Sequence, residues 1–225
     1  MIESIVNKFR TKNVITAVFL GDSVTAGYFE SSKDKMHSKA NHDMVYHNRL
    51  KKILNFYFPE KIINIINSGI GGQTSTQGLQ RIEEDVISHN PDFVVVCFGL
   101  NDASRPVERY IENMSAIFEE LTKRKIDVIY MTPNMLNTAV VRDILPEIAK
   151  AKAELQNSGQ MDIHMEAGRK TAKQYNIPIC DCYNYWKTLN SIGIDTNRLL
   201  ANGINHPVEQ MHWLFAAKLF DTIFI

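Results

Sequence analysis

Five short runs of apolar, largely β-branched residues recur along the chain, and longer stretches with helical periodicity separate them. The apolar runs are Val14–Leu20, Ile62–Ile66, Phe93–Phe98, Asp127–Met131 and Ile177–Cys180. The helical stretches are Asp43–Phe56, Gln77–Ser88, Val107–Lys123, Met161–Gln174 and Val208–Phe224. Strands that alternate with helices predict a parallel sheet covered on both faces, and continuous apolar runs are typical of strands buried on two sides. The pattern therefore predicts a five-stranded, three-layer α/β/α fold of the flavodoxin-like type.

The length of the chain suits one large domain. For 225 residues, roughly 70–75% of the unfolded surface is buried on folding, so the core needs no disulfide or metal. No repeat or Pro/Gly-rich linker divides the sequence, and we expect a single domain over residues 1–225. The pattern is irregular only between Thr132 and Ile163. An excursion that covers the substrate and a plain surface insertion are equally good interpretations of that segment.

Charge and hydropathy exclude several classes of protein. Lys plus Arg and Asp plus Glu both number 25, and a balanced chain has no electrostatic footprint for nucleic acid. No segment reaches the ~20 apolar residues of a membrane span, and residues 1–11 lack the apolar core of a signal peptide, so we expect a cytoplasmic protein. Cys97, Cys180 and Cys182 lie in apolar segments and are expected to be buried, reduced thiols. No Cys/His cluster completes a metal site beside them, and we expect neither a metal nor another cofactor.

Residues able to do chemistry follow the first three predicted strands. The segments are Gly21-Asp22-Ser23-Val24-Thr25, Asn67-Ser68-Gly69-Ile70-Gly71-Gly72 and Gly99-Leu100-Asn101-Asp102. In sheets of this type the site forms beyond the carboxyl ends of the strands, so these segments are expected to meet. Each also has a purely structural interpretation, as a helix cap, a tight turn or a turn with an Asx residue. The glycine spacing is not the dinucleotide-binding fingerprint, and no phosphate-binding loop occurs, which counts against a nucleotide-binding protein.

One of the seven histidines stands out by its position. His206 follows Asn202-Gly203-Ile204-Asn205 and comes just before the last predicted helix, where it can reach over the strand ends toward Ser23. His212 lies inside that helix beside Trp213 and is expected to be a packing residue. The others are expected to face solvent: His37, His42, His47, His89 and His164.

Together these segments resemble the SGNH hydrolase family, also called GDSL-like lipases and esterases. The family's four blocks are matched by Gly21-Asp22-Ser23, the Gly69–Gly72 loop, Gly99-Leu100-Asn101-Asp102 and His206-Pro207. The resemblance implies that Ser23 is the nucleophile and His206 its general base. It also implies an oxyanion hole made of the backbone N–H groups of Ser23 and Gly72 and the side chain of Asn101, with Gly71 as the alternative to Gly72.

The sequence departs from the family at one position. The family usually has an aspartate three residues before the histidine, and here that position is Gly203. An ionised partner holds the imidazole tautomer, and its removal in a well-studied serine protease costs about 10⁴ in turnover. We favour a Ser–His dyad, with a backbone carbonyl or Asn202 orienting His206. A carboxylate from elsewhere is the alternative, and Asp195 is the nearest in sequence.

The resemblance implies a metal-free serine esterase that acts on small carboxylic esters. Deacetylation of a carbohydrate is the first expectation, and a lysophospholipase or thioesterase activity is the second. Tyr28, Met135 and the Met131–Leu136 segment are candidates for the acyl pocket, although each is more simply explained as packing. A non-catalytic carbohydrate-binding descendant of the fold is a further alternative, and retention of all four blocks counts against it.

Overall fold

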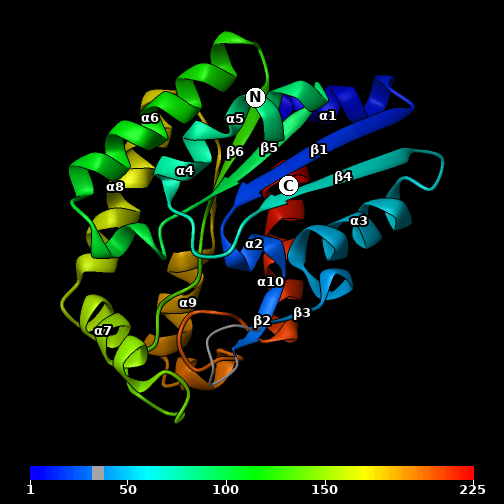
Figure 1. The fold of residues 1–225 in the computed structure, drawn as a ribbon. Helices are drawn as coiled ribbons and strands as arrows, with labels where there is room; N and C mark the ends of the chain where they lie inside the picture. Colours follow the sequence, from blue (N-terminus) through cyan, green and yellow to red (C-terminus); the bar gives the residue numbers. More distant parts are fainter. Residues whose placement is uncertain (32–37) are drawn as a thin grey trace.

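A five-stranded parallel sheet forms the centre of the computed structural model, which describes residues 1–31 and 38–225 (Figure 1). Its strands are β1 (Val14–Gly21), β4 (Ile62–Gly69), β5 (Phe93–Cys97), β6 (Asp127–Thr132) and β7 (Ile179–Asp181). They are arranged in the order β4-β1-β5-β6-β7, and every neighbouring pair is parallel. All five predicted strands are therefore confirmed, and so is the three-layer α/β fold.

Helices cover both faces of the sheet (Figure 1). One layer contains α1 (Ile2–Thr11), α3 (Tyr46–Tyr57) and α10 (Glu209–Phe224), and α10 packs on both of the others. The opposite layer contains α4 (Ser75–Gln80), α6 (Val107–Lys123) and α8 (Gln160–Gln174), with α6 between its two neighbours. Within the described residues, no helix has both the length and the apolar character required to cross a bilayer.

The central strands are buried on both sides, as their apolar sequences require. Every residue of β5 and β6 is buried. Helix α6 lies on them through a stripe of apolar residues spaced three or four apart, which is the spacing of one helix face. The buried members of that stripe are Tyr110, Met114, Ile117, Phe118 and Leu121.

The helix predicted over Gln77–Ser88 is wrong as one element. The structure has α4, then α5 (Ile82–Asp85) and a 3-10 turn at Ile87–His89. The break falls at Arg81, whose guanidinium donates to the Gly21 carbonyl at the end of β1 (3.0 Å) and to the Gln73 side chain (2.7 Å). These tertiary contacts bend the chain toward the strand ends, and local periodicity carries no sign of them.

Several elements were not among the predicted ones. They are α1, the short α2 (Ser23–Ala26), the antiparallel pair β2 (Tyr28–Ser31) and β3 (Ser38–Ala40), α7 (Pro146–Asn157) and α9 (Cys182–Ser191). Helix α7 lies within the segment that looked irregular in sequence, and Pro146 at its first turn is a common helix start rather than a breaker.

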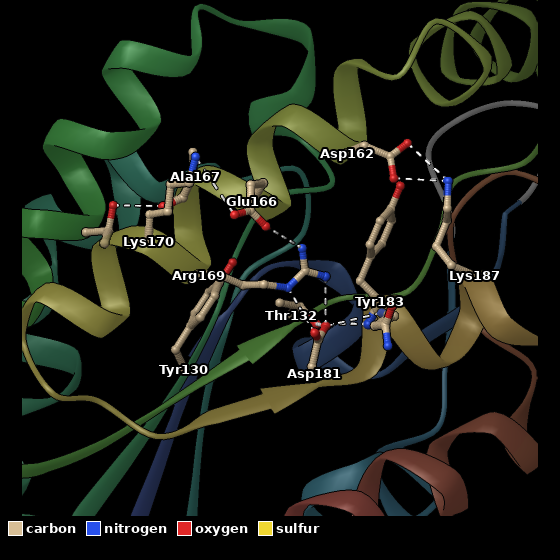
Figure 2. Close-up of polar contacts among 12 residues, drawn as sticks. Tyr130, Thr132, Asp162, Glu166, Ala167, Arg169, Lys170, Asp181, Tyr183 and Lys187 are labelled. Carbon is tan, nitrogen blue, oxygen red and sulfur yellow. Dashed lines mark hydrogen bonds and ion pairs between the residues drawn. The ribbon is translucent and has the colours of Figure 1, made fainter.

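The ends of β6 and β7 are joined by a polar network (Figure 2). Arg169 of α8 forms two hydrogen bonds with the carboxylate of Asp181, at 2.9 and 3.0 Å. The same carboxylate accepts from the Thr132 hydroxyl at 2.9 Å. A bidentate guanidinium–carboxylate pair has a defined geometry. The network therefore fixes the point at which the chain leaves β6 for the excursion that leads to α7.

The expectations for the other histidines are confirmed in part. His42 and His89 are exposed, and His37 lies outside the described residues. The prediction is wrong for His47 and His164, which are buried, and a ring nitrogen of each is hydrogen-bonded to the backbone carbonyl of Thr25 or Arg105, respectively. His212 packs among Phe29, Tyr46 and Phe215, as expected. The three cysteines are buried and free, which confirms that prediction as well.

Candidate active site

Three neighbouring strands deliver the candidate residues to one cavity. Strands β4, β1 and β5 lie side by side and parallel, so the segments that follow Gly69, Gly21 and Cys97 emerge at the same edge of the sheet. A cavity of about 310 Å³ lies there. Its lining residues are Ser23, Tyr28, Gly71, Gly72, Asn101, Leu145, Ile148, Lys152, Asn202, Ile204, Asn205 and His206.

Ser23 is presented by a very short helix. The side chain of Asp22 accepts from the Val24 N–H (3.0 Å) and so caps α2, while Gly27 ends it in the left-handed conformation (φ 96°). The helix-cap interpretation is therefore correct for Asp22, whereas Ser23 is the first helical residue and its side chain is not used in the cap. Within the described part of the chain, the N–H of Ser23 has no hydrogen-bond acceptor. Such a group is available to a ligand.

The imidazole of His206 is hydrogen-bonded to the hydroxyl of Ser23. Its Nε2 lies 2.9 Å from Ser23 Oγ, and its Nδ1 lies 3.2 Å from the carbonyl oxygen of Phe29 in β2. A carbonyl oxygen accepts only, so Nδ1 carries the hydrogen and Nε2 is the nitrogen with the free lone pair. The imidazole is thus held in the tautomer that can take the serine proton.

The loop before His206 is organised by Asn202. Its Oδ1 accepts from the N–H groups of Ile204, Asn205 and His206, at 3.0, 2.9 and 2.9 Å. Asn202 therefore holds the backbone of the histidine loop, whereas the ring nitrogen Nδ1 meets the Phe29 carbonyl instead. Of the two orienting groups considered for the dyad, the structure has the backbone carbonyl at the imidazole.

The carboxylate alternative is wrong for Asp195. Its side chain caps the 3-10 turn Thr196–Leu199 by accepting from Asn197 N (3.1 Å), and it pairs with Arg198. The family's aspartate position, Gly203, has φ 68° and lies against the Arg142 side chain. Residues with a Cβ rarely adopt that backbone conformation. The local fold therefore suits glycine at the position where the family usually has a carboxylate.

Burial sets the proton affinities of the site. It lowers the pKa of His206 to about 4, partly opposed by the Phe29 carbonyl. It raises the pKa of Asp22 to about 7, an effect that the Val24 N–H reduces. A neutral imidazole is the form that accepts a proton, so His206 is ready to act as a base throughout the neutral range.

A pH–activity profile tests this assignment. We expect kcat/KM for p-nitrophenyl acetate to rise as the pH increases through about 4, since His206 loses its proton there and only the neutral ring accepts one from Ser23. An acid limb centred near 6.5, the value of an unperturbed histidine, would contradict the buried geometry. Asp22→Asn is the matched control, because it keeps an acceptor for Val24 N–H and removes any inflection that Asp22 causes near pH 7.

The remaining candidate donors also border the cavity. The Asn101 side chain uses one amide hydrogen on the Gln73 carbonyl (3.0 Å), which leaves its second hydrogen for a ligand. Gly72 has φ 76° and open space at its Cβ position, and within the described residues its N–H donates to no protein group. Gly71 also borders the cavity and packs beside the Tyr28 ring. The choice of Gly72 over Gly71 as the oxyanion donor stays a prediction.

The excursion after β6 supplies a wall that sequence reasoning did not assign. Ile148 and Lys152 lie four residues apart on α7, Leu145 directly precedes that helix, and all three line the cavity. This arrangement favours the substrate-covering interpretation of the 132–163 segment. Of the proposed acyl-pocket residues, Tyr28 lines the cavity. Met135 is buried in the core instead.

Comparison with known proteins identifies the family. The model of the GDSL-like lipase/acylhydrolase family matches residues 19–214. The chain belongs to this family. Its fold is that of the lipase/acylhydrolase from Enterococcus faecalis, with a TM-score of 0.72 and 24% identity over 93% of this chain and 95% of that one. The family that the four sequence blocks resemble is thereby confirmed.

Two curated relatives of this GDSL-like protein match shorter segments. An acetylxylan esterase of Geobacillus stearothermophilus is 42% identical over 53 residues, which are 24% of each chain. Thioesterase 1/protease 1/lysophospholipase L1 of Escherichia coli (strain K12) is 32% identical over 97 residues, 43% of this chain and 39% of that protein. The chain thus spans between about a quarter and two fifths of the length of these relatives.

Proposed function

We propose that this GDSL-like protein is a serine esterase that hydrolyses small carboxylic esters, acetyl esters of carbohydrates first among them. The observation that carries the proposal is the contact of 2.9 Å between His206 Nε2 and Ser23 Oγ, with the opposite ring nitrogen on the Phe29 carbonyl. A nucleophile bonded to a base that a third group orients is the arrangement of covalent acyl transfer.

The reaction proceeds in two halves. Ser23 Oγ attacks the ester carbonyl carbon as its proton passes to His206 Nε2, and the carbonyl electron pair moves to the oxygen. N–H donors from Ser23, Gly72 and Asn101 stabilise that oxyanion. Collapse expels the alcohol, which takes the proton from the imidazolium. Water then attacks the acyl group with His206 as base, and the carboxylic acid leaves Ser23 free.

Two features support a small acyl group. The cavity of about 310 Å³ is at the lower end of the range for ligand sites, and the polar residues Asn101, Asn202 and Asn205 are among those that line it. One curated relative is an acetylxylan esterase. The acetyl group is the smallest common acyl group, and the alcohol part of the substrate then extends toward solvent.

A lipid or thioester substrate is the second candidate. The apolar side chains of Leu145 and Ile148 lie in the cavity wall, and Ile148 is 38% exposed. Another curated relative carries the name thioesterase 1/protease 1/lysophospholipase L1. Apolar walls of this kind stabilise a longer acyl chain by burying its methylene groups.

A substrate panel tests the proposal. Initial rates are measured for p-nitrophenyl acetate, p-nitrophenyl octanoate, an acetylated xylo-oligosaccharide and palmitoyl-CoA. We expect the highest kcat/KM on the acetyl esters and release of acetate from the oligosaccharide. Preference for the octanoate or the thioester would replace the first candidate by the second. A wild-type protein inert on every ester would overturn the catalytic proposal and favour the carbohydrate-binding alternative.

A further inference from the structure

Lys152 is a charged residue in the cavity wall to which the proposed mechanism gives no part. It lies on α7, is partly buried, and donates from Nζ to the Leu100 carbonyl oxygen at 2.7 Å. Among the described residues that line the cavity, it is the only lysine, arginine, aspartate or glutamate. Leu100 directly precedes Asn101, so the ammonium group is attached to the peptide that carries a proposed oxyanion donor.

Two buried carboxyl groups belong to residues next in sequence to the proposed oxyanion donors Ser23 and Asn101. Asp22 directly precedes Ser23, Asp102 directly follows Asn101, and both are almost fully buried. Burial raises the pKa of each, to about 7 for Asp22, and the charge of Lys152 opposes the shift of Asp22. Part of the Asp22 population is therefore ionised at neutral pH. A negative charge there disfavours a second negative charge on the substrate oxygen.

Asp102 also accepts hydrogen bonds from Ser75, the first residue of α4, which follows the Gly69–Gly72 loop. Its Oδ1 accepts from the N–H and the hydroxyl of Ser75, at 2.9 and 2.5 Å, whereas its Oδ2 is buried with no partner among the described residues. An unpartnered buried carboxyl oxygen is costly when ionised. A cation close to this pair of carboxyl groups reduces that cost.

Resting on the proposed esterase function, we propose that Lys152 is a positioning residue of the oxyanion hole. Its ammonium group holds the Leu100 carbonyl and with it the Asn101 segment, and its charge offsets Asp22 and Asp102 when the substrate oxygen becomes negative. Because the oxyanion exists only after nucleophilic attack, Lys152 acts on kcat and leaves the binding of the neutral ester almost unchanged.

The test compares four substitutions for p-nitrophenyl acetate hydrolysis. We expect Lys152→Met to lower kcat by about 10- to 100-fold, the value of a hydrogen bond to a charged group, with KM within about threefold of wild type. Lys152→Arg keeps the charge and restores most of the lost rate. Lys152→Gln keeps a hydrogen-bond donor without the charge, and its kcat is expected to lie between those of Lys152→Met and Lys152→Arg. Lys150→Met is the matched control, since Lys150 is exposed on the same helix, and its rates stay at the wild-type level.

A tetrahedral mimic separates this role from simple support of the fold. Phenylboronic acid becomes a tetrahedral anion when it bonds to a serine oxygen, so its Ki is expected to rise in Lys152→Met by the same factor as kcat falls. A kcat within twofold of wild type, or a lost rate with unchanged boronate affinity, would overturn the inference. If Lys152→Met does not fold, Lys152→Gln and Lys152→Arg give the same comparison. A wild type without esterase activity would instead refute the proposed function.

Discussion

Replacing Ser23 by alanine is expected to lower kcat for p-nitrophenyl acetate by about 10⁴-fold or more, as removal of a serine nucleophile does in other enzymes. The Ser23 hydroxyl is the group that His206 Nε2 contacts, at 2.9 Å. Alanine removes this hydroxyl and leaves the Asp22 cap of α2 in place. The fold is therefore expected to be retained, and the loss is one of chemistry.

Labelling by a fluorophosphonate identifies the nucleophile without turnover. The wild type is expected to gain the mass of one phosphonyl group at Ser23, and Ser23→Ala to gain none. Ser88→Ala is the matched control, because Ser88 is exposed and its hydroxyl donates to the nearby Glu84 carbonyl. Retained hydrolysis in Ser23→Ala, or labelling of another residue, would refute the assignment of the nucleophile.

Replacing His206 by alanine is expected to lower kcat by about 10²- to 10⁴-fold, the usual contribution of a general base. The ring is the only imidazole that lines the cavity in the described structure, and its Nε2 is the acceptor for the serine proton. Because the oxyanion donors lie on other segments, a residual rate above that of water is expected.

Controls for His206→Ala address both folding and specificity. His206 is buried, so far-UV circular dichroism and the thermal midpoint are measured for the variant, and His206→Gln tests a side chain that fills more of the space. His89→Ala, at an exposed histidine, should keep the wild-type rate. A folded His206→Ala protein with at least a tenth of the wild-type kcat would contradict the role of His206 as base.

Much of the fold was readable from the sequence because its signals are local. The apolar runs of β1, β4, β5, β6 and β7 predicted the five strands, and α6 coincides with its predicted bounds. Burial on both sides applies to the central strands β5 and β6, whereas the edge strand β4 is partly exposed. The elements with weaker sequence patterns were not predicted. Helix α7 carries few large apolar residues, and β2–β3 is too short for an alternating pattern to be recognised. The bend at Arg81 depends on a contact with Gly21, 60 residues away.

The candidate site was likewise predicted from the sequence in part. The meeting of the segments that hold Ser23, Gly72 and Asn101 was predicted because parallel strands bring their carboxyl ends to one edge. The choice of these residues, and of His206 before the last helix, came from the resemblance to the four blocks of the family. Ser23, Gly72, Asn101 and His206 all line one cavity in the structure. Sequence motifs therefore identified these four residues of the candidate site, although not the wall that α7 contributes.

Only the tertiary structure decided what surrounds those side chains. The partner of His206 Nδ1 is the Phe29 carbonyl, and every residue has a carbonyl, so no residue type marks it in the sequence. Lys152 lies on α7, far from Asn101 in sequence. Its ammonium group donates to the backbone carbonyl of Leu100, the residue before Asn101. Motifs record side-chain chemistry at fixed local spacing. Backbone acceptors, charges from distant helices and burial that lowers the pKa of His206 to about 4 arise only when the chain has folded.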